Sequence, residues 1–115
     1  MAGLDIKRSH AALQAIEQAA QEKKDVPEFL SQIKELPSAL RINGLLAVLA
    51  ERKEMEALLH PWLTAPEAPI AWEQTTGALQ ERLTSRVVYR QATAEALSFS
   101  VWLKRWAEAI HAEPK

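Results

Sequence analysis

The chain of 115 residues contains no cysteine. This absence excludes disulfides, thiol catalysis and every zinc site that needs thiolate ligands. Glycine is scarce, with three residues, and strand signals are nearly missing, the one β-branched pair of note being Val87–Val88. The first ten residues contain no apolar run of the kind found in a secretory signal, and no segment approaches the roughly 20 apolar residues of a membrane span. We therefore expect a soluble, cytoplasmic protein with little or no sheet.

The chain also lacks an excess of positively or negatively charged residues. The 14 Lys and Arg residues nearly balance the 15 Asp and Glu residues, so the charge of the whole molecule does not attract nucleic acid or an acidic membrane. Binding to an anionic partner must therefore come from a local patch of cations.

The residues that are abundant favour helices. Ala, Leu, Glu, Gln, Lys and Arg dominate the chain, and the length fits one domain over residues 1–115. Periodicity and proline positions predict an all-α bundle of about five to six helices. We expect these helices over Leu4–Lys24, Glu28–Glu35, Pro37–Lys53, Glu54–Leu63, Ala71–Thr84 and a long terminal segment, with a proline-punctuated connection over Thr64–Ile70.

Asn43-Gly44 lies inside the third expected helix. This pair is a turn signal in other settings, but the helical periodicity on both sides argues against a turn. A glycine costs about 1 kcal/mol relative to alanine in a helix interior. We therefore expect Gly44 to permit the close approach of a neighbouring helix, or less favourably of a ligand backbone.

The terminal segment carries the clearest apolar stripe. At about 100° per residue, steps of three and four residues place its apolar side chains on one face of an α-helix. This face is predicted to lie in the core, and its members are Tyr89, Ala92, Ala96, Phe99, Leu103, Trp106 and Ile110.

The other side of the same helix combines cations with apolar residues. Arg86, Arg90, Lys104 and Arg105 surround Leu97 and Val101 there. A fully solvated face has no reason to carry two such apolar residues, which favours a docking surface. The alternative is an ordinary solvated face, whose charges pair with Glu95 or Glu108.

Trp102 lies between the apolar and the basic face. Aromatic rings interleaved with cations can form a stacking platform for single-stranded nucleic acid. Trp106 is predicted to belong to the core, whereas Trp102 either shields the edge of the core or touches a partner. Trp62 and Trp72 bracket the proline-rich connection and are expected to anchor its ends.

Candidates for catalysis are few. His10, His60 and His111 are far apart and show no metal-ligand spacing. Glu51, Glu54 and Glu56 lie in a run of mixed charge, and no phosphate-binding loop or nucleophile motif is present. We therefore expect no catalytic residue, no metal, no cofactor and no enzymatic activity.

Two segments together resemble a known family. LPSALRINGLLAVLAERK, over Leu36–Lys53, and YRQATAEALSFSVWLKRWAEA, over Tyr89–Ala109, are similar to the small helical subunit of the type III-B CRISPR effector, the Cmr complex. The matching features are Leu36-Pro37, Asn43-Gly44-Leu45, Tyr89, the Thr93–Ala96 step, Trp102–Arg105 and Ala107. These features are not an active-site signature, but their order and spacing are shared with the family.

The resemblance implies a non-catalytic subunit of an antiviral ribonucleoprotein, present in several copies along the guide RNA. Its expected partners are the backbone and large Cmr subunits, neighbouring copies of itself, and the phosphate backbone of guide and target RNA. Sequence specificity in such an assembly comes from base pairing. The candidate RNA-binding residues are Arg41, Arg52, Lys53, Arg86, Arg90, Lys104 and Arg105, and the candidate protein-interface residues are Leu97, Val101 and Trp102.

Two other functions compete with this interpretation. One is a helical protein–protein adaptor with no RNA role, related to the family only in fold. The more distant one is a metal-dependent enzyme, which the missing ligand spacings disfavour.

Overall fold

The computed structural model describes residues 2–22 and 26–111. This part of the chain forms helices and connections without any strand, which confirms the all-α prediction. The five helices are α1 (Ala2–Glu22), α2 (Val26–Glu51), α3 (Lys53–Leu63), α4 (Leu79–Arg82) and α5 (Arg86–His111). None of these helices is both long enough and apolar enough to cross a membrane.

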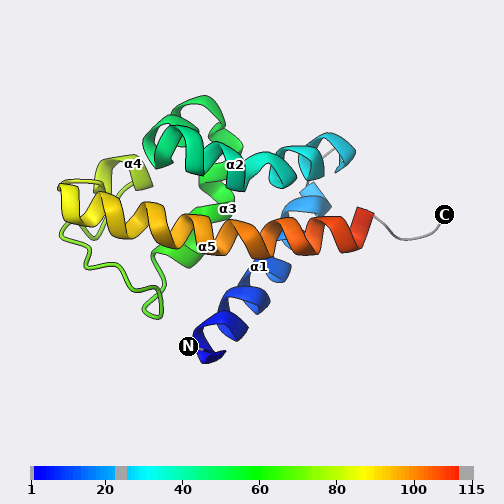
Figure 1. The fold of residues 1–115 in the computed structure, drawn as a ribbon, viewed down its shortest axis with the longest axis horizontal. Helices are drawn as coiled ribbons and strands as arrows, with labels where there is room; N and C mark the ends of the chain where they lie inside the picture. Colours follow the sequence, from blue (N-terminus) through cyan, green and yellow to red (C-terminus); the bar gives the residue numbers. More distant parts are fainter. Residues whose placement is uncertain (1, 23–25, 112–115) are drawn as a thin grey trace.

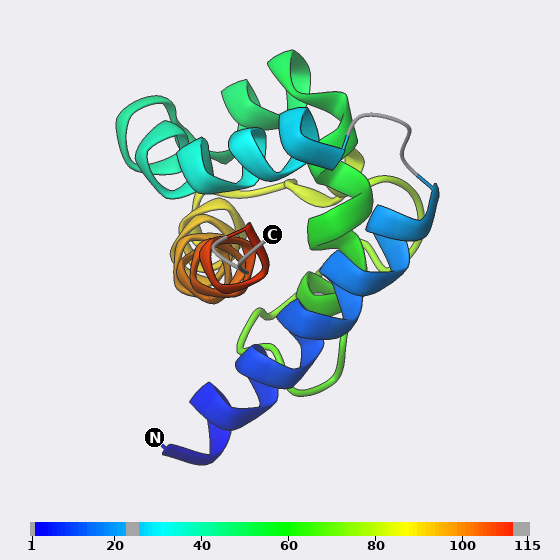
Figure 2. The ribbon, with the colours of Figure 1, turned by 90° about the vertical axis from the view of Figure 1, so that its right-hand side faces the viewer.

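Helix α5 is the central element of the bundle. It runs along the longest dimension of the molecule, α2 lies beside it, and α1 crosses it (Figure 1). Viewed along α5, α2 lies above it, while α3 and α1 lie beside it (Figure 2). The short α4 precedes α5 in the chain. Most of the core is therefore built on one side of α5.

The inner face of α5 follows the predicted stripe in part. Its buried apolar residues are Val88, Ala92, Ala96, Phe99, Leu103 and Ala107. Tyr89 and Trp106 are half-buried and pack against this core. Ile110 was predicted to be buried, and this is wrong, because its side chain is 38% exposed. It lies in the last turn of α5, which reaches the edge of the bundle (Figure 1).

Helix α2 differs from the sequence prediction in where it breaks. We expected two helices separated before Pro37, yet Pro37 is buried inside α2. The interruption falls at Gly44, whose φ of 85° and ψ of 168° are not helical. Glycine adopts this positive φ without the steric penalty that a side chain incurs. The helix expected over Pro37–Lys53 is therefore not continuous, because it kinks at Gly44.

The second expectation for Gly44 is confirmed. A Cβ atom at this position would lie 2.5 Å from the hydroxyl oxygen of Tyr89 on α5. No side chain fits there while Tyr89 keeps its position. Gly44 thus provides both the kink in α2 and the space that α5 needs.

The helix expected over Ala71–Thr84 is mostly absent. Residues 64–78 form turns and irregular chain, and only α4 is helical in this part of the sequence. Trp72 Nε1 donates a hydrogen bond to the Leu63 carbonyl at 2.8 Å, and the Ala71 N–H donates to Gln91 Oε1 at 2.8 Å. Gly77 adds a positive φ of 97°. These tertiary bonds and the glycine turn override helix propensity. The bond of Trp72 also supports its predicted anchoring role.

Candidate functional site

The basic face of α5, defined by Arg86, Arg90, Lys104 and Arg105, is exposed as the sequence predicts. The structure divides it into two pairs. Arg90 and Lys104 are 14 positions apart, which corresponds to about 21 Å along an α-helix. The part of α5 between the two pairs presents the uncharged residues Ala94, Leu97, Ser98 and Val101. The face therefore has cationic ends and an uncharged middle.

The two apolar residues on this face have different surroundings. Leu97 is half-buried and packs against the core, so the interior already explains part of its apolar character. Val101 is also half-buried. The sequence analysis missed Val87 near the start of α5, whose side chain is 60% exposed. Val87 and Val88 are adjacent and equally apolar, so the sequence did not show which of the two is exposed.

The sequence left open that Glu95 or Glu108 neutralises the basic face, and the structure removes Glu95 from this pairing. Glu95 is only 3% exposed and therefore cannot pair with the basic face. Glu108 is exposed, but none of the four cations forms an ion pair with any acidic side chain in the described part of the chain. The positive charge of the face is thus available to an external anion.

Glu95 instead joins three helices in the interior. The Arg8 guanidinium of α1 donates from Nε to Glu95 Oε2 at 2.6 Å and from Nη2 to Oε1 at 2.7 Å. Trp62 Nε1 of α3 donates to Oε2 at 2.7 Å. A buried carboxylate is tolerated only when such partners compensate for its lost hydration. This network, called the Glu95 cluster below, fixes α5 against α1 and α3.

Neighbouring contacts reinforce the Glu95 cluster. The hydrogen bond to Glu95 raises the pKa of Arg8, so the guanidinium stays charged. Arg8 Nη1 also donates to Asp5 Oδ1 at 2.8 Å. The Trp62 ring stacks on Phe99, with centroids 5.8 Å apart and planes 12° apart. These contacts have a structural role, since they hold the inner side of α5 while its outer side stays free.

Trp102 and Arg105 contact each other near the carboxyl end of α5. The guanidinium carbon of Arg105 lies 4.7 Å from the centroid of the Trp102 ring, within range of a cation–π interaction. Trp102 is half-buried and packs against the core. Lys104 points about 100° away from Arg105 around the helix axis. The two cations therefore face different directions.

Trp106 is held more firmly than Trp102. Its Nε1 donates to the Ser9 carbonyl at 3.1 Å and to Ser9 Oγ at 3.2 Å. These bonds connect the carboxyl half of α5 to α1. The predicted core role of Trp106 is consistent with this position.

The other candidate cations lie away from α5. Arg41 is exposed on α2, and Lys53 is exposed at the start of α3. Arg52, between these helices, donates from Nη1 to Glu35 Oε1 at 3.3 Å. Part of its charge is therefore already neutralised on the protein.

The histidines do not assemble a metal site. His10 is exposed on α1, and His60 Nε2 lies 3.4 Å from the Gly77 carbonyl oxygen. The side chain of His111 lies outside the described residues. Within the part of the chain that the structure describes, no three His, Asp or Glu residues are grouped so that they could hold a metal ion.

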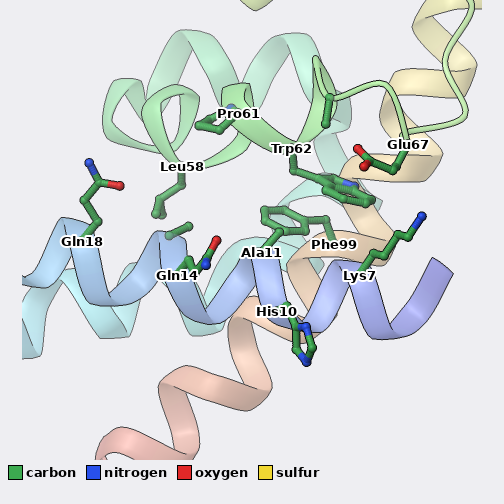
Figure 3. A pocket seen from close by; sticks show the side chains of 12 residues that line it. Lys7, His10, Ala11, Gln14, Gln18, Leu58, Pro61, Trp62, Glu67 and Phe99 are labelled. Carbon is green, nitrogen blue, oxygen red and sulfur yellow. The ribbon is translucent and has the colours of Figure 1, made fainter. Parts of the chain in front are cut away.

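The sequence analysis also missed a groove between α1 and α3 (Figure 3). It consists of two adjacent cavities of about 430 Å³ and 250 Å³, both lined by Ala15, Gln18, Leu58 and Pro61. Trp62 and Phe99 lie together between the two helices in the larger cavity (Figure 3). Only the packing of α1 on α3 creates this surface, and neither helix shows it alone.

The geometry defines a small helical protein with a basic outer face on its central helix. A family model described as CRISPR-associated protein (Cas_Cmr5) matches residues 4–110. The chain therefore belongs to the Cmr5 family, and it is the non-catalytic small subunit of the type III-B Cmr effector. No curated protein and no solved structure matches the chain.

Proposed function

We propose that this subunit helps to bind target RNA in the Cmr effector through the basic face of α5. The supporting observation is that four cations on the outer side of α5 are exposed and have no acidic partner among the described residues, while the inner side of α5 is fixed. Arginine and lysine are the usual ligands of phosphate groups. Base pairing with the guide RNA supplies specificity, so this surface needs only charge and shape.

The two cationic pairs would contact separate phosphates. A distance of about 21 Å along α5 is too long for one phosphate group to span. Each phosphate contact on a single strand contributes about 0.7 to the salt slope of binding, so a few contacts give weak binding by a single subunit. Repetition of the subunit along one RNA would strengthen binding through effective concentration.

The uncharged middle of the face suits a protein neighbour. Leu97 and Val101 are both half-buried and lie between the cationic pairs. We assign them to contacts with the backbone subunits, the large subunit or a neighbouring copy. Arg41, Lys53 and the partly neutralised Arg52 would be secondary RNA contacts on α2 and α3. Because guide and target RNA are found in the cytoplasm, we expect the protein there.

Charge reversal tests the RNA assignment. In a reconstituted Cmr complex, Lys104→Glu/Arg105→Glu should weaken target-RNA binding severalfold, as measured by filter binding. Lys7→Glu/Lys34→Glu is the matched control, because it makes the same charge change on α1 and α2 and should have a much smaller effect. Equal binding by the Lys104/Arg105 variant and the unmodified complex would contradict the assignment.

The α1–α3 groove favours a second candidate function, a protein–protein adaptor without an RNA role. Ligand and peptide sites are typically concave and mostly apolar, as this groove is. The charge-reversal variant separates the two candidates. Weaker target-RNA binding with unchanged incorporation into the complex supports the RNA role, whereas unchanged target-RNA binding supports the adaptor.

A further inference from the structure

A pocket of about 360 Å³ lies where α1 crosses the carboxyl half of α5. Four residues of α1 line it, namely Asp5, Ile6, Ser9 and His10, and Trp102 lines it from α5. Ile6 is 56% exposed although it is a large apolar residue. The pocket therefore combines an aromatic wall, an uncovered apolar side chain and three polar groups.

We propose that this pocket binds an unstacked nucleobase of single-stranded RNA, with the base against the Trp102 ring. The inference rests on the proposed function, because it requires RNA to pass over this end of α5. Base stacking on an aromatic side chain is a main source of affinity for single strands, and it depends little on sequence. The pocket would thus add stacking to the phosphate contacts of the basic face.

Two walls of the pocket, Ser9 and Trp102, are held in place before any ligand binds. Trp106, one turn beyond Trp102, is hydrogen-bonded to the carbonyl and hydroxyl oxygens of Ser9, which is itself a wall residue. Trp102 is held by its packing against the core. A ring that is already in place loses little conformational entropy when a base stacks on it.

Arg105 places a phosphate contact beside the same ring. Its guanidinium carbon lies 4.7 Å from the centroid of the Trp102 ring, and Arg105 does not line the pocket. A guanidinium over an aromatic ring keeps N–H donors that can bind a phosphate. One nucleotide could therefore place its base in the pocket while a neighbouring phosphate meets Arg105.

The polar groups favour a base over a phosphate inside the pocket. One oxygen of the Asp5 carboxylate accepts a hydrogen bond from Arg8, and its negative charge would repel a phosphate group. Carboxylates accept hydrogen bonds from exocyclic amino groups, as in contacts with cytosine N4. The Ser9 hydroxyl and the His10 imidazole can complete the recognition of a base edge. The ligand class is therefore a nucleobase that carries an amino group.

Photocrosslinking tests the pocket directly. Target RNAs carrying 5-iodocytidine at successive positions are bound to the reconstituted complex, irradiated and digested, and the crosslinked peptides are identified by mass spectrometry. We expect crosslinks to Trp102 or to the α1 peptide that contains Asp5–His10. Crosslinks of this subunit confined to other peptides would overturn the proposal.

Binding measurements with matched variants complete the test. Trp102→Leu should weaken target-RNA binding by about tenfold per occupied site without changing its salt slope, and Trp102→Phe should restore most of the loss. Trp72→Leu is the control, because Trp72 also has an arginine over its ring, with the guanidinium carbon of Arg82 5.9 Å from the centroid, but does not line the pocket. Circular dichroism and incorporation into the complex establish that each variant is folded.

The results separate this inference from the proposed function. If Trp102→Leu binds RNA normally while Lys104→Glu/Arg105→Glu binds weakly, the pocket proposal fails and the basic face remains. If neither variant affects binding, both proposals fail.

Discussion

Helix α5 is attached to its two main neighbours by different chemistry. Its junction with α1 depends on polar bonds, namely the Glu95 cluster and the bond from Trp106 to Ser9. Its junction with α2 contains a shape constraint, in which Tyr89 lies where a side chain at position 44 would be. Hydrogen bonds require specific partners and distances, whereas apolar packing tolerates exchange between residues of similar volume. The α1 junction should therefore be the more sensitive to the loss of single groups.

The largest effect is expected from Arg8→Ala. It leaves the Glu95 carboxylate buried without its ionic partner, which should lower the free energy of unfolding by about 3–5 kcal/mol. Chemical denaturation of the purified protein measures this change. Asp5→Ala is the control, because it removes only the exposed partner of Arg8 and should cost less than about 1 kcal/mol. Similar losses in the two variants would show that the α1 junction does not depend on the Glu95 cluster.

Gly44→Ala tests the α2 junction and should cost about 2 kcal/mol. The methyl group meets the Tyr89 hydroxyl, and the backbone conformation of Gly44, which is essentially confined to glycine, costs a side chain about 1–3 kcal/mol. Tyr89→Phe removes the hydroxyl but leaves the backbone unchanged. The double variant should therefore recover about 1 kcal/mol of the loss in thermal or chemical unfolding. Strict additivity of the two changes would mean that the hydroxyl does not restrict position 44.

A smaller effect is expected from Trp106→Phe. This change keeps an aromatic ring but removes the N–H that donates to Ser9. The free energy of unfolding should fall by about 1 kcal/mol, the typical net contribution of one hydrogen bond. Hydrogen exchange of the α1 backbone should become faster in the same variant. Unchanged exchange would indicate that the bond does not secure α1.

The smallest effect on stability is expected at the outer side of α5. Arg86→Gln/Arg90→Gln alters exposed side chains without an acidic partner among the described residues. The free energy of unfolding should change by no more than about 0.5 kcal/mol. A larger loss would mean that these cations stabilise the fold, which would weaken the argument that they are available for RNA.

The periodicity of the sequence predicts which residues of a helix are buried where the helix packs along its apolar stripe. The apolar stripe of α5 and the exposure of its four cations could be derived from sequence because both depend on the angle between successive residues. The prediction of a helix over Ala71–Thr84 was wrong, because the hydrogen bond from Trp72 to Leu63 and the turn at Gly77 override the helix propensity of this segment. The prediction that Ile110 is buried was wrong for a different reason, since the pattern of one helix does not show where the neighbouring helices end.

The candidate site also depends on contacts between distant parts of the chain, which the sequence does not reveal. Arg8 and Glu95 are 87 positions apart, and no local signal connects them. The sequence therefore left Glu95 as a possible partner of the basic face, whereas it belongs to the interior. The α1–α3 groove and the pocket at Trp102 likewise exist only after helices from distant segments pack together. Membership of the Cmr5 family was predictable because it depends on the order of short motifs. The assignment of individual RNA contacts stays a prediction.

The salt dependence of target-RNA binding tests the central claim most directly. The reconstituted complex is compared with one carrying Lys104→Gln/Arg105→Gln, and the logarithm of the binding constant is plotted against the logarithm of the salt concentration. If each of the two residues contacts a phosphate, the slope should become less steep by about 1.4 for one copy of the subunit, or about 0.7 per contact. An unchanged slope together with unchanged affinity would contradict the assignment of this end of α5 to RNA.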